Sequence, residues 1–282
     1  MNNKKKIIDS PFFILGVVIV MILGAIALIS YLFEDEPEII EEKVIEIPER
    51  KPYIDYYDNC FSNYPYLKYE DDDYTSMFGI DVAAHQETID WKKVKEAGVE
   101  FAYIRLGYRG ALEGIMHIDD EFENNYMGAT KNGIKVGIYW YAQPSNEIES
   151  IEEANFVLDV LNGRHLDLPI AYDFEETEFY TGELSRMHGM SKSDRTLMAN
   201  AFCDIMKKNN LDTIIYANQY WADNYYDYDL IKNNPLWFAQ YKETPSFDYP
   251  VRIWQYCEDG ELDGIDNIVD LDIMFIRKND QN

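Results

Sequence analysis

Leu168-Pro169-Ile170-Ala171-Tyr172-Asp173-Phe174-Glu175-Glu176-Thr177 is an apolar run that ends in three carboxylates. Side chains alternate between the two faces of a strand, so Asp173 and Glu175 are predicted to point one way and Phe174 and Glu176 the other. Like charges in one small space keep one carboxylic acid protonated beside an ionised partner. The alternative is a strand end whose acids enter a solvated loop, and Glu176 is expected to be solvated in either case.

Similar strand-like runs occur on both sides of this stretch, and helical patterns separate the earlier ones. The predicted strands are Phe78–Val82, Val99–Gly107, Ile134–Tyr141, Leu168–Glu175, Thr213–Asn218, Leu236–Tyr241, Val251–Tyr256 and Val269–Phe275. The predicted helices are Trp91–Ala97, with Asp90 as its N-cap, Asp120–Asn132, Ile148–Leu161 and Ser193–Asn209. This alternation predicts a parallel sheet.

About eight strands over roughly 200 residues favour a closed, TIM-like β/α barrel of the α/β class over an open doubly wound sheet. Few or no helices are expected between the last three strands. The chain contains no glycine-rich phosphate loop, which disfavours a nucleotide site.

The composition of the 282-residue chain is strongly acidic, with 25 Lys and Arg against 52 Asp and Glu and a net charge of -27. This charge argues against nucleic acid as a partner. Hydrophobic residues make up 47% of the chain and aromatic residues 15%, which is ample for a folded core.

The N-terminal region has the pattern of a membrane anchor. Residues 12–33 contain no charged side chain and would span about 33 Å as a helix, enough to cross a bilayer. Three lysines precede this run and acidic residues follow it, so residues 1–11 are predicted to be cytoplasmic and residues 77–282 extracytoplasmic, on the cell-wall side of a single-pass protein. A cleaved signal peptide, with Ala25-Ile26-Ala27 at the cleavage site, is the alternative.

Residues 34–76 are predicted to link this anchor to the barrel. The first part is rich in Glu and reads as a solvated acidic stalk, whereas residues 51–76 are rich in Tyr and Asp and are expected to pack on the domain as an N-terminal extension. Cys60, Cys203 and Cys257 are widely spaced and form no metal-binding or disulfide motif, so unpaired cysteines are expected, with a Cys60–Cys257 pair as the alternative. The sequence does not indicate an oligomeric state.

The active site of a β/α barrel gathers at the C-terminal ends of the strands. The residues predicted there are carboxylates, aromatics and amides, a set that suits sugar rings with their hydroxyl and acetamido groups. They are Asp81, Arg105, Tyr139, Tyr141, Gln143, Asp173, Glu175, Tyr216, Asn218, Gln240, Tyr241, Trp254, Gln255 and Asp270.

Several motifs in this order resemble glycoside hydrolase family 25, the Chalaropsis-type lysozymes or N-acetylmuramidases. They are Phe78-Gly79-Ile80-Asp81-Val82-Ala83-Ala84-His85-Gln86, Ile89-Asp90-Trp91, Phe101-Ala102-Tyr103-Ile104-Arg105, Val136-Gly137-Ile138-Tyr139, Ala171-Tyr172-Asp173-Phe174-Glu175, Leu236-Trp237-Phe238-Ala239-Gln240-Tyr241, Trp254-Gln255-Tyr256 and Val269-Asp270-Leu271-Asp272. The resemblance runs from about Phe78 to Phe275 and implies a barrel whose later strands lack helices.

The resemblance implies a peptidoglycan hydrolase that acts on the β-1,4 bond between N-acetylmuramic acid and N-acetylglucosamine, with Glu175 as the acid/base and Asp173 as the stabilising or orienting partner. Asp81 and Asp270 would complete the acidic site, and no cofactor or metal is implied. Two positions depart from the family pattern. Ala83 stands where Ser is common, and Glu87 where Gly or Asn is common.

Two alternatives use the same residues differently. A metal-dependent hydrolase would hold a divalent cation with Asp81, His85, Asp173, Glu175 and Asp270. A non-catalytic wall-binding barrel would keep the fold only to bind sugar. If the chain is a glycosidase, retention of configuration with help from the substrate's own acetamido group is the favoured hypothesis.

Overall fold

The computed structural model describes residues 56–63, 65–177, 179, 181–231, 233–246 and 249–281. Residues 12–33, where the sequence predicts a membrane anchor, and residues 34–55 of the predicted stalk lie outside this part. Among the described residues, no helix has the length and apolar character needed to cross a bilayer.

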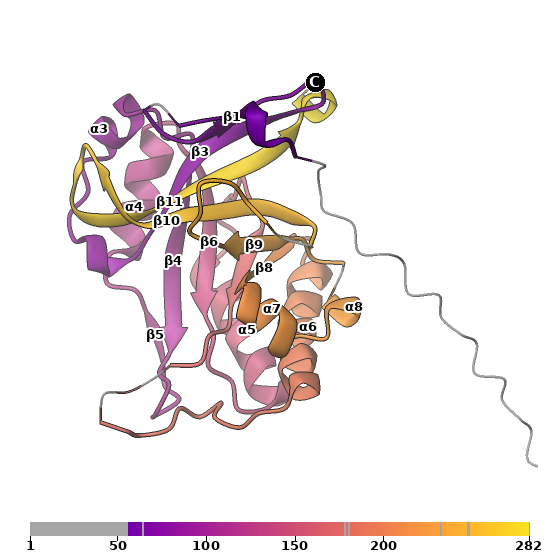
Figure 1. Cartoon of the computed structure of the whole chain (residues 1–282). Coiled ribbons are helices and arrows are strands. Elements are labelled where there is room, and N and C mark those ends of the chain that lie inside the picture. Colours follow the sequence, from indigo (N-terminus) through magenta and orange to yellow (C-terminus); the bar gives the residue numbers. More distant parts are fainter. Residues whose placement is uncertain are drawn as a thin grey trace, which may run out of the picture. The chain divides into compact units, whose positions relative to one another are not determined.

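Eight strands form a closed barrel (Figure 1). Their order around the barrel is β3-β11-β10-β9-β8-β7-β6-β4, and pairing between β3 and β4 closes it. The strands are β3 (Tyr74–Val82), β4 (Phe101–Arg109), β6 (Lys135–Tyr141), β7 (Ile170–Asp173), β8 (Thr213–Asn218), β9 (Leu236–Ala239), β10 (Val251–Leu262) and β11 (Ile265–Arg277). A short strand, β5 (Met116–Ile118), pairs with β4 outside the barrel. The prediction of an eight-stranded closed barrel is therefore confirmed.

The last strand runs against its neighbours, so the prediction of a wholly parallel sheet is wrong for β11. This strand pairs antiparallel with both β10 and β3, whereas the other barrel pairs are parallel. Only Asp263 and Gly264 separate β10 from β11, and a connection this short makes a hairpin, because a parallel pair needs a long crossover. Gly264 has a φ of 101°, which L side chains rarely adopt. Because β11 is reversed, its N-terminal half lies at the end of the barrel where the parallel strands finish.

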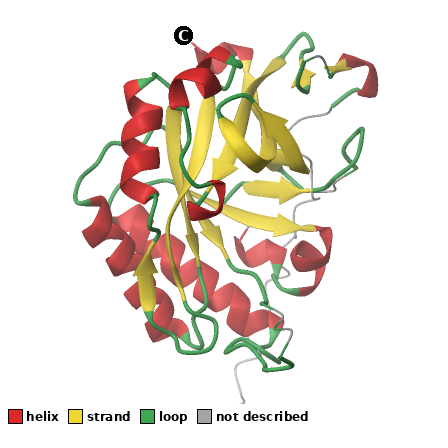
Figure 2. Ribbon diagram, turned by 90° about the vertical axis from the view of Figure 1, so that its left-hand side faces the viewer, coloured by secondary structure: helices red, strands yellow, loops and turns green. Residues whose placement is uncertain are grey.

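Helices cover the outside of the earlier strands (Figure 2). They are α3 (Trp91–Glu96), α4 (Phe122–Lys131), α5 (Glu147–Leu161), α6 (Lys192–Lys208) and the short α7 (Gln219–Asn224) and α8 (Tyr228–Ile231). Asp90 caps α3 as predicted, because its side chain accepts hydrogen bonds from the backbone N–H of Lys92 and Lys93. The described residues between β9 and β11 contain no helix, which confirms the expectation for the last three strands.

Strand alternation divides the core into an inner and an outer cluster. The inner cluster fills the barrel and includes Tyr103, Ala171 and Trp237, with the Tyr103 and Trp237 rings 4.6 Å apart. The outer cluster lies between strands and helices, where the Tyr172 ring packs on Phe202 of α6 at 4.8 Å. Since Tyr172 faces outward, its neighbour Asp173 faces the barrel interior.

Residues 56–63 and 65–73 pack against the barrel through aromatic contacts. This segment contains a 3-10 helix (η1, Asp58–Cys60) and a pair of two-residue strands, β1 (Phe61–Ser62) and β2 (Lys68–Tyr69). Phe61 contacts Trp254 at 5.8 Å, and Tyr66 stacks on Phe78 at 4.3 Å. Strand β3 begins at Tyr74 because residues 74–77 pair with the C-terminal end of β11.

Candidate active site

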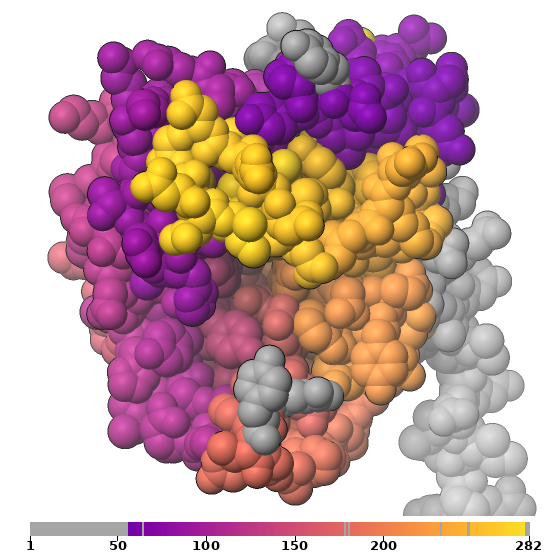
Figure 3. All heavy atoms as spheres, turned by 60° about the vertical axis from the view of Figure 1, so that its left-hand side comes forward, coloured from indigo at the N-terminus to yellow at the C-terminus, as the bar shows by residue number. Residues whose placement is uncertain are grey.

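A cavity of about 330 Å³ opens where the parallel strands end. Figure 3 shows a hollowed face of the molecule below the yellow C-terminal residues, between the magenta and orange surfaces. The residues that line the cavity come from β3, β4, β6, β8, β9, β10, β11 and the end of β7. They are Asp81, Arg105, Tyr139, Tyr141, Asp173, Glu175, Tyr216, Trp237, Tyr241, Gln255, Glu258 and Asp270.

The four acids predicted as catalytic all line this cavity. Asp81 and Asp173 are each only 7% exposed, whereas Glu175 and Asp270 are partly exposed. Asp270 lies opposite Asp81 in the β11–β3 register, so the reversal of β11 brings the two acids together. The barrel thus gathers carboxylates from three strands at one end.

Gln255 connects the acids to the tyrosines of the cavity. Its amide nitrogen donates to Oδ2 of Asp81 at 2.8 Å. Its Oε1 accepts hydrogen bonds from the hydroxyls of Tyr216, at 2.8 Å, and Tyr241, at 3.0 Å. Because the amide nitrogen and the amide oxygen both have hydrogen-bond partners, the orientation of this amide is fixed, and the Asp81 carboxylate is held at the cavity floor.

Burial strongly perturbs the Asp173 and Glu175 pair. Burial raises the pKa of Asp173 well above its usual range, and the neighbouring Glu175 carboxylate raises it further. Burial also raises the pKa of Glu175 to about 7, although its side-chain hydrogen bond with Asp173 lowers it. Protons on so close a pair belong to both groups, and at neutral pH the pair therefore retains a proton that ordinary carboxylic acids would have lost.

The acids on the other side of the cavity are perturbed in the same direction. Burial, followed by the nearby Asp272 carboxylate, raises the pKa of Asp81 well above its usual range. Burial and Asp81 raise the pKa of Asp270 to about 9, and burial raises that of Asp272 to about 8. Trp237 Nε1 donates to Asp272 Oδ1 at 2.8 Å, which ties this fully buried carboxyl to the cavity wall.

Among the described residues that line the cavity, Arg105 alone has a cationic side chain. Its Nε donates to Oδ2 of the buried Asp119 at 2.7 Å, and its Nη1 lies 3.3 Å from Nε2 of His85. Asp119 also accepts a hydrogen bond from the backbone N–H of Ala84. The guanidinium is therefore held in place beside the acids.

The backbone around Glu175 is held by side chains at and just after the end of β6. Gln143 Nε2 donates to the carbonyl oxygen of Glu175 at 2.6 Å. The hydroxyls of Tyr141 and Thr177 are hydrogen-bonded at 2.8 Å. These contacts position the Glu175 side chain although β7 itself ends at Asp173.

Glu176 is a partly buried anchor whose side chain is 22% exposed, so the prediction that it is solvated is wrong. Its carboxylate accepts from His188 Nδ1 at 3.0 Å, from Arg195 Nη2 at 3.0 Å and from the Tyr225 hydroxyl at 2.9 Å. The Arg195 guanidinium also lies 4.0 Å from the centre of the Tyr225 ring. Strand alternation correctly puts Glu176 on the outer face, but on that face it packs against Arg195 of α6 and Tyr225, which follows α7.

Replacing Glu176 with alanine is expected to lower the free energy of unfolding by about 3 kcal/mol, because it leaves the guanidinium of Arg195 buried without its carboxylate. The Arg195 side chain is only 3% exposed. Urea denaturation of the two forms measures this difference. The matched control is Glu96→Ala, which removes an exposed ion pair with Lys92 and is expected to cost less than about 0.5 kcal/mol. Equal losses from both substitutions would contradict the anchoring role of Glu176.

Six of the ten predicted substrate-binding residues line the cavity, and four do not. The six are Arg105, Tyr139, Tyr141, Tyr216, Tyr241 and Gln255. Trp254 lies on the opposite face of β10 from Gln255, where its Nε1 donates to the carbonyl oxygen of Gln240.

The side chains of the other three support the structure nearby. Gln240 accepts from the backbone N–H of Ser246, Asn218 caps α7, and Gln143 holds the Glu175 backbone.

Three residues of the site were not predicted from the sequence. Trp237 and Glu258 line the cavity, and Asp272 supports its wall through Trp237. Trp237 lies in the middle of β9, and its place on the inner face could have been found from strand alternation. Asp272 follows Asp270 by two residues and so shares its face. Glu258 could not have been found this way, because irregular register between Gln255 and Gly260 interrupts the alternation of β10.

The metal-dependent alternative lacks a suitable donor cluster in the described part of the chain. No group of three or more His, Cys, Asp or Glu side chains is arranged there to hold a metal ion. His85 contacts Arg105, and its backbone carbonyl accepts from Asn267. The donors that are present fit a proton-transfer site better than a cation site.

Comparisons with known proteins agree with this geometry. Residues 80–265 match the family model described as "Glycosyl hydrolases family 25". The "Autolytic lysozyme" of Clostridium acetobutylicum is 30% identical over 198 residues, which cover 70% of this chain and 55% of the relative. The matched part of the chain thus spans about half the length of that relative.

Two solved structures have the same fold. The bacterial lysozyme from Streptomyces coelicolor aligns with a TM-score of 0.57 and 27% identity, over 70% of this chain and 90% of that chain. The modular autolysin LytC from Streptococcus pneumoniae, solved in complex with a synthetic peptidoglycan ligand, aligns with a TM-score of 0.65 and 23% identity, over 77% of this chain and 49% of that chain.

Proposed function

The chain belongs to glycosyl hydrolases family 25, and from this premise we propose that it is a peptidoglycan hydrolase that cleaves the β-1,4 bond between N-acetylmuramic acid and N-acetylglucosamine. One observation supports this proposal more strongly than any other. A partly exposed Glu175 with a raised pKa lies beside the buried Asp173, at the end of the family-matched barrel where ligands bind. The lysozyme relatives support the choice of peptidoglycan as the substrate.

Glu175 is the proton donor of this proposal. Breaking a glycosidic bond near neutral pH requires a proton on the leaving oxygen, and an ordinary carboxylic acid has lost its proton at that pH. Glu175 keeps a transferable proton because burial raises its pKa to about 7. It is also the more exposed member of the pair, so it can reach a bound sugar. After bond cleavage, the same carboxylate accepts a proton from the attacking water.

Asp173 supplies the negative charge of the reaction. The transition state of glycoside hydrolysis has oxocarbenium character, and a carboxylate in a site with little water stabilises it strongly. Asp81 and Asp270 complete the acidic floor, and Gln255 fixes Asp81 in place. Tyr139, Tyr141, Tyr216 and Tyr241 offer ring faces and hydroxyls to the sugar, and Arg105 offers hydrogen-bond donors.

The stereochemical course is proposed to be retention with participation of the substrate's 2-acetamido group. In this course Asp173 orients the acetamido group and stabilises the charge that develops on it. Proton NMR of a freshly cleaved soluble substrate is expected to show the β-anomer as the first product. Initial formation of the α-anomer would contradict retention and would require a water on the opposite face of the sugar.

The activity is expected to depend on pH through the Glu175 proton. The acid form of Glu175 is required, and it is lost as the pH rises through its pKa of about 7, so kcat/KM should fall across this region. Initial rates on a soluble glycan between pH 4 and about 9 measure the profile. A profile that stays flat well above neutral pH would show that another group donates the proton.

The location of the enzyme follows from the sequence and is part of the proposal. Residues 12–33 would anchor the chain in the cell membrane, and residues 34–55 would connect this anchor to the barrel on the cell-wall side. Such an anchor favours cutting of the wall close to the membrane. Detergent-dependent extraction of the full chain from membranes, compared with a variant lacking residues 12–33, tests this location.

Clearing of purified peptidoglycan separates the proposed function from its two alternatives. The wild-type chain is expected to clear a suspension of insoluble peptidoglycan in the presence of EDTA, whereas the Glu175→Gln variant should bind without clearing it. Loss of clearing in EDTA with rescue by added metal would favour the metal-dependent hydrolase. Sedimentation of the wild-type chain with peptidoglycan that never clears would favour a wall-binding barrel without catalysis.

A further inference from the structure

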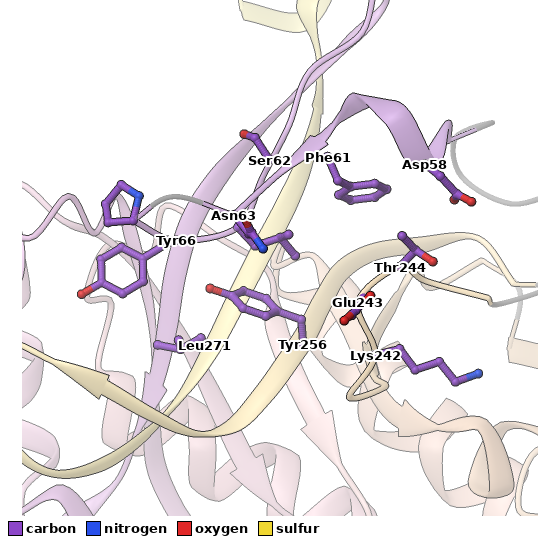
Figure 4. Close-up of a pocket in the computed structure, with 12 residues that line it drawn as sticks. Asp58, Phe61, Ser62, Asn63, Tyr66, Lys242, Glu243, Thr244, Tyr256 and Leu271 are labelled. Atoms are coloured by element: carbon purple, nitrogen blue, oxygen red, sulfur yellow. The ribbon is translucent and has the colours of Figure 1, made fainter.

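A second hollow, of about 610 Å³, lies on the outer side of the barrel (Figure 4). One wall is formed by residues 58–63 and 65–67 of the N-terminal segment, and the other is the loop after β9, residues 242–244. Tyr256 of β10 and Leu271 of β11 form the floor. Figure 4 shows Tyr256 between the segment that carries Asn63 and Tyr66 and the loop that carries Glu243 and Thr244. A volume of this size suits a ligand of a few hundred daltons.

The hollow is next to the candidate active site but separate from it. Tyr256 follows Gln255, and Leu271 follows Asp270, so strand alternation puts the floor of the hollow and the wall of the active site on opposite faces of the same two strands. Tyr241 lines the active site, and the next residue, Lys242, lines the hollow.

The lining of the hollow combines ring faces with available polar groups. Tyr66, Tyr256 and Phe61 supply the aromatic surface. Ser62, Asn63, Glu243 and Thr244 also line it, and their side chains make no hydrogen bond to the described part of the chain. Aromatic faces with a few polar groups around them are the usual surface for a sugar ring. The amide of Asn63 and the carboxylate of Glu243 can pair with the carbonyl and the N–H of an acetamido group.

The charges around the hollow favour a neutral ligand over an anionic one. Asp58 and Glu243 contribute two carboxylates, against the single ammonium group of Lys242. Lys242 Nζ already donates to Ser246 Oγ at 2.7 Å. Phosphate groups and lactyl carboxylates are therefore disfavoured, whereas an N-acetylhexosamine without a charged substituent is compatible.

We propose that this hollow is a second glycan-binding site, which holds a neutral N-acetylhexosamine unit of a peptidoglycan strand outside the active site. The inference rests on the proposed function for its choice of polymer. The N-terminal wall of the hollow lies before residues 80–265, which are the part of the chain that the family model matches. The site is therefore an addition to the family-matched barrel. A second point of attachment keeps the enzyme on an insoluble polymer between cleavage events.

The test compares two variants of the full chain, both carrying Glu175→Gln so that no substrate is consumed. The first adds Asn63→Ala and Glu243→Ala in the hollow, and the second, as a matched control, adds Asn155→Ala and Glu261→Ala on exposed positions that line neither site. Equal melting temperatures establish that both variants are folded. The hollow variant is expected to sediment with insoluble peptidoglycan about tenfold more weakly than the control.

Calorimetric titration with a β-1,4-linked N-acetylglucosamine tetramer measures the number of binding sites per chain. The control is expected to bind the tetramer at two sites per chain and the hollow variant at one. Equal stoichiometry and equal sedimentation of the two variants would overturn the proposal. A free stem peptide that binds the control but not the hollow variant would overturn the assignment to sugar. Clearing by the wild-type chain is measured separately, so failure of the proposed hydrolysis is distinguishable from failure of the second site.

Discussion

Replacing Glu175 with glutamine is expected to lower kcat on peptidoglycan about 1,000-fold, because the amide keeps the shape of the side chain but cannot donate a proton to the leaving oxygen. The structure gives Glu175 this task through its position in the cavity and its pKa of about 7. Release of soluble glycan fragments measures kcat. Binding to insoluble peptidoglycan should change little, since the amide still fills the same space.

The matched control for this substitution is Glu258→Gln. Glu258 lines the same cavity, but its side chain is exposed, so it is expected to contribute far less to the reaction. A large loss of kcat in Glu258→Gln together with a small one in Glu175→Gln would transfer the acid role to Glu258. Similar small losses in both would contradict acid catalysis by either residue.

Replacing Asp173 with asparagine is expected to lower kcat about 100-fold or more, because the transition state loses a desolvated negative charge. The free energy of unfolding should not fall, since the substitution keeps the shape and removes the cost of burying an ionised carboxyl that is only 7% exposed. Urea denaturation and kcat measured on the same preparation test both parts. Loss of activity accompanied by an equal loss of folded protein would contradict a direct role in charge stabilisation.

Asp173→Asn also tests whether the raised pKa of Asp173 makes the free energy of unfolding depend on pH. A carboxyl whose pKa is raised in the folded state binds its proton more tightly there than in the unfolded state, so stability falls as the pH rises from the unfolded pKa through the folded one. The pKa of Asp173 is raised well above its usual range. The free energy of unfolding of the wild type should therefore decrease from mildly acidic toward neutral pH, and it should decrease less in the variant.

The barrel was predictable because its strands carry a strong local signal. Runs such as Thr213–Asn218 have the same bounds in the sequence prediction and in the structure. The direction of β11 was missed because the prediction ended β10 at Tyr256, six residues before its end at Leu262. The Asp263-Gly264 pair, a strong signal for a two-residue hairpin, was therefore not recognised as the turn between two strands. Asp270 was nevertheless assigned to the site through its place in the family motif, and the reversal of β11 is what brings it opposite Asp81.

The candidate site was predictable where alternation and strand ends agree. Asp81 and the Asp173–Glu175 pair were found in this way, and they line the cavity. Trp254 was misplaced because its neighbour Gln255 is the residue that faces inward. The environment of Glu176 depends on Arg195 and Tyr225, which are distant in sequence, so only the tertiary structure could show that this acid is anchored.

The reducing ends that the enzyme creates test the proposed reaction most directly. Purified peptidoglycan is incubated with the wild-type chain or with Glu175→Gln, the products are reduced with borohydride, and the reduced sugars are identified by mass spectrometry. The account predicts reduced N-acetylmuramic acid ends from the wild type and none above background from the variant. Reduced N-acetylglucosamine ends from the wild type, or equal muramic acid ends from both proteins, would contradict it.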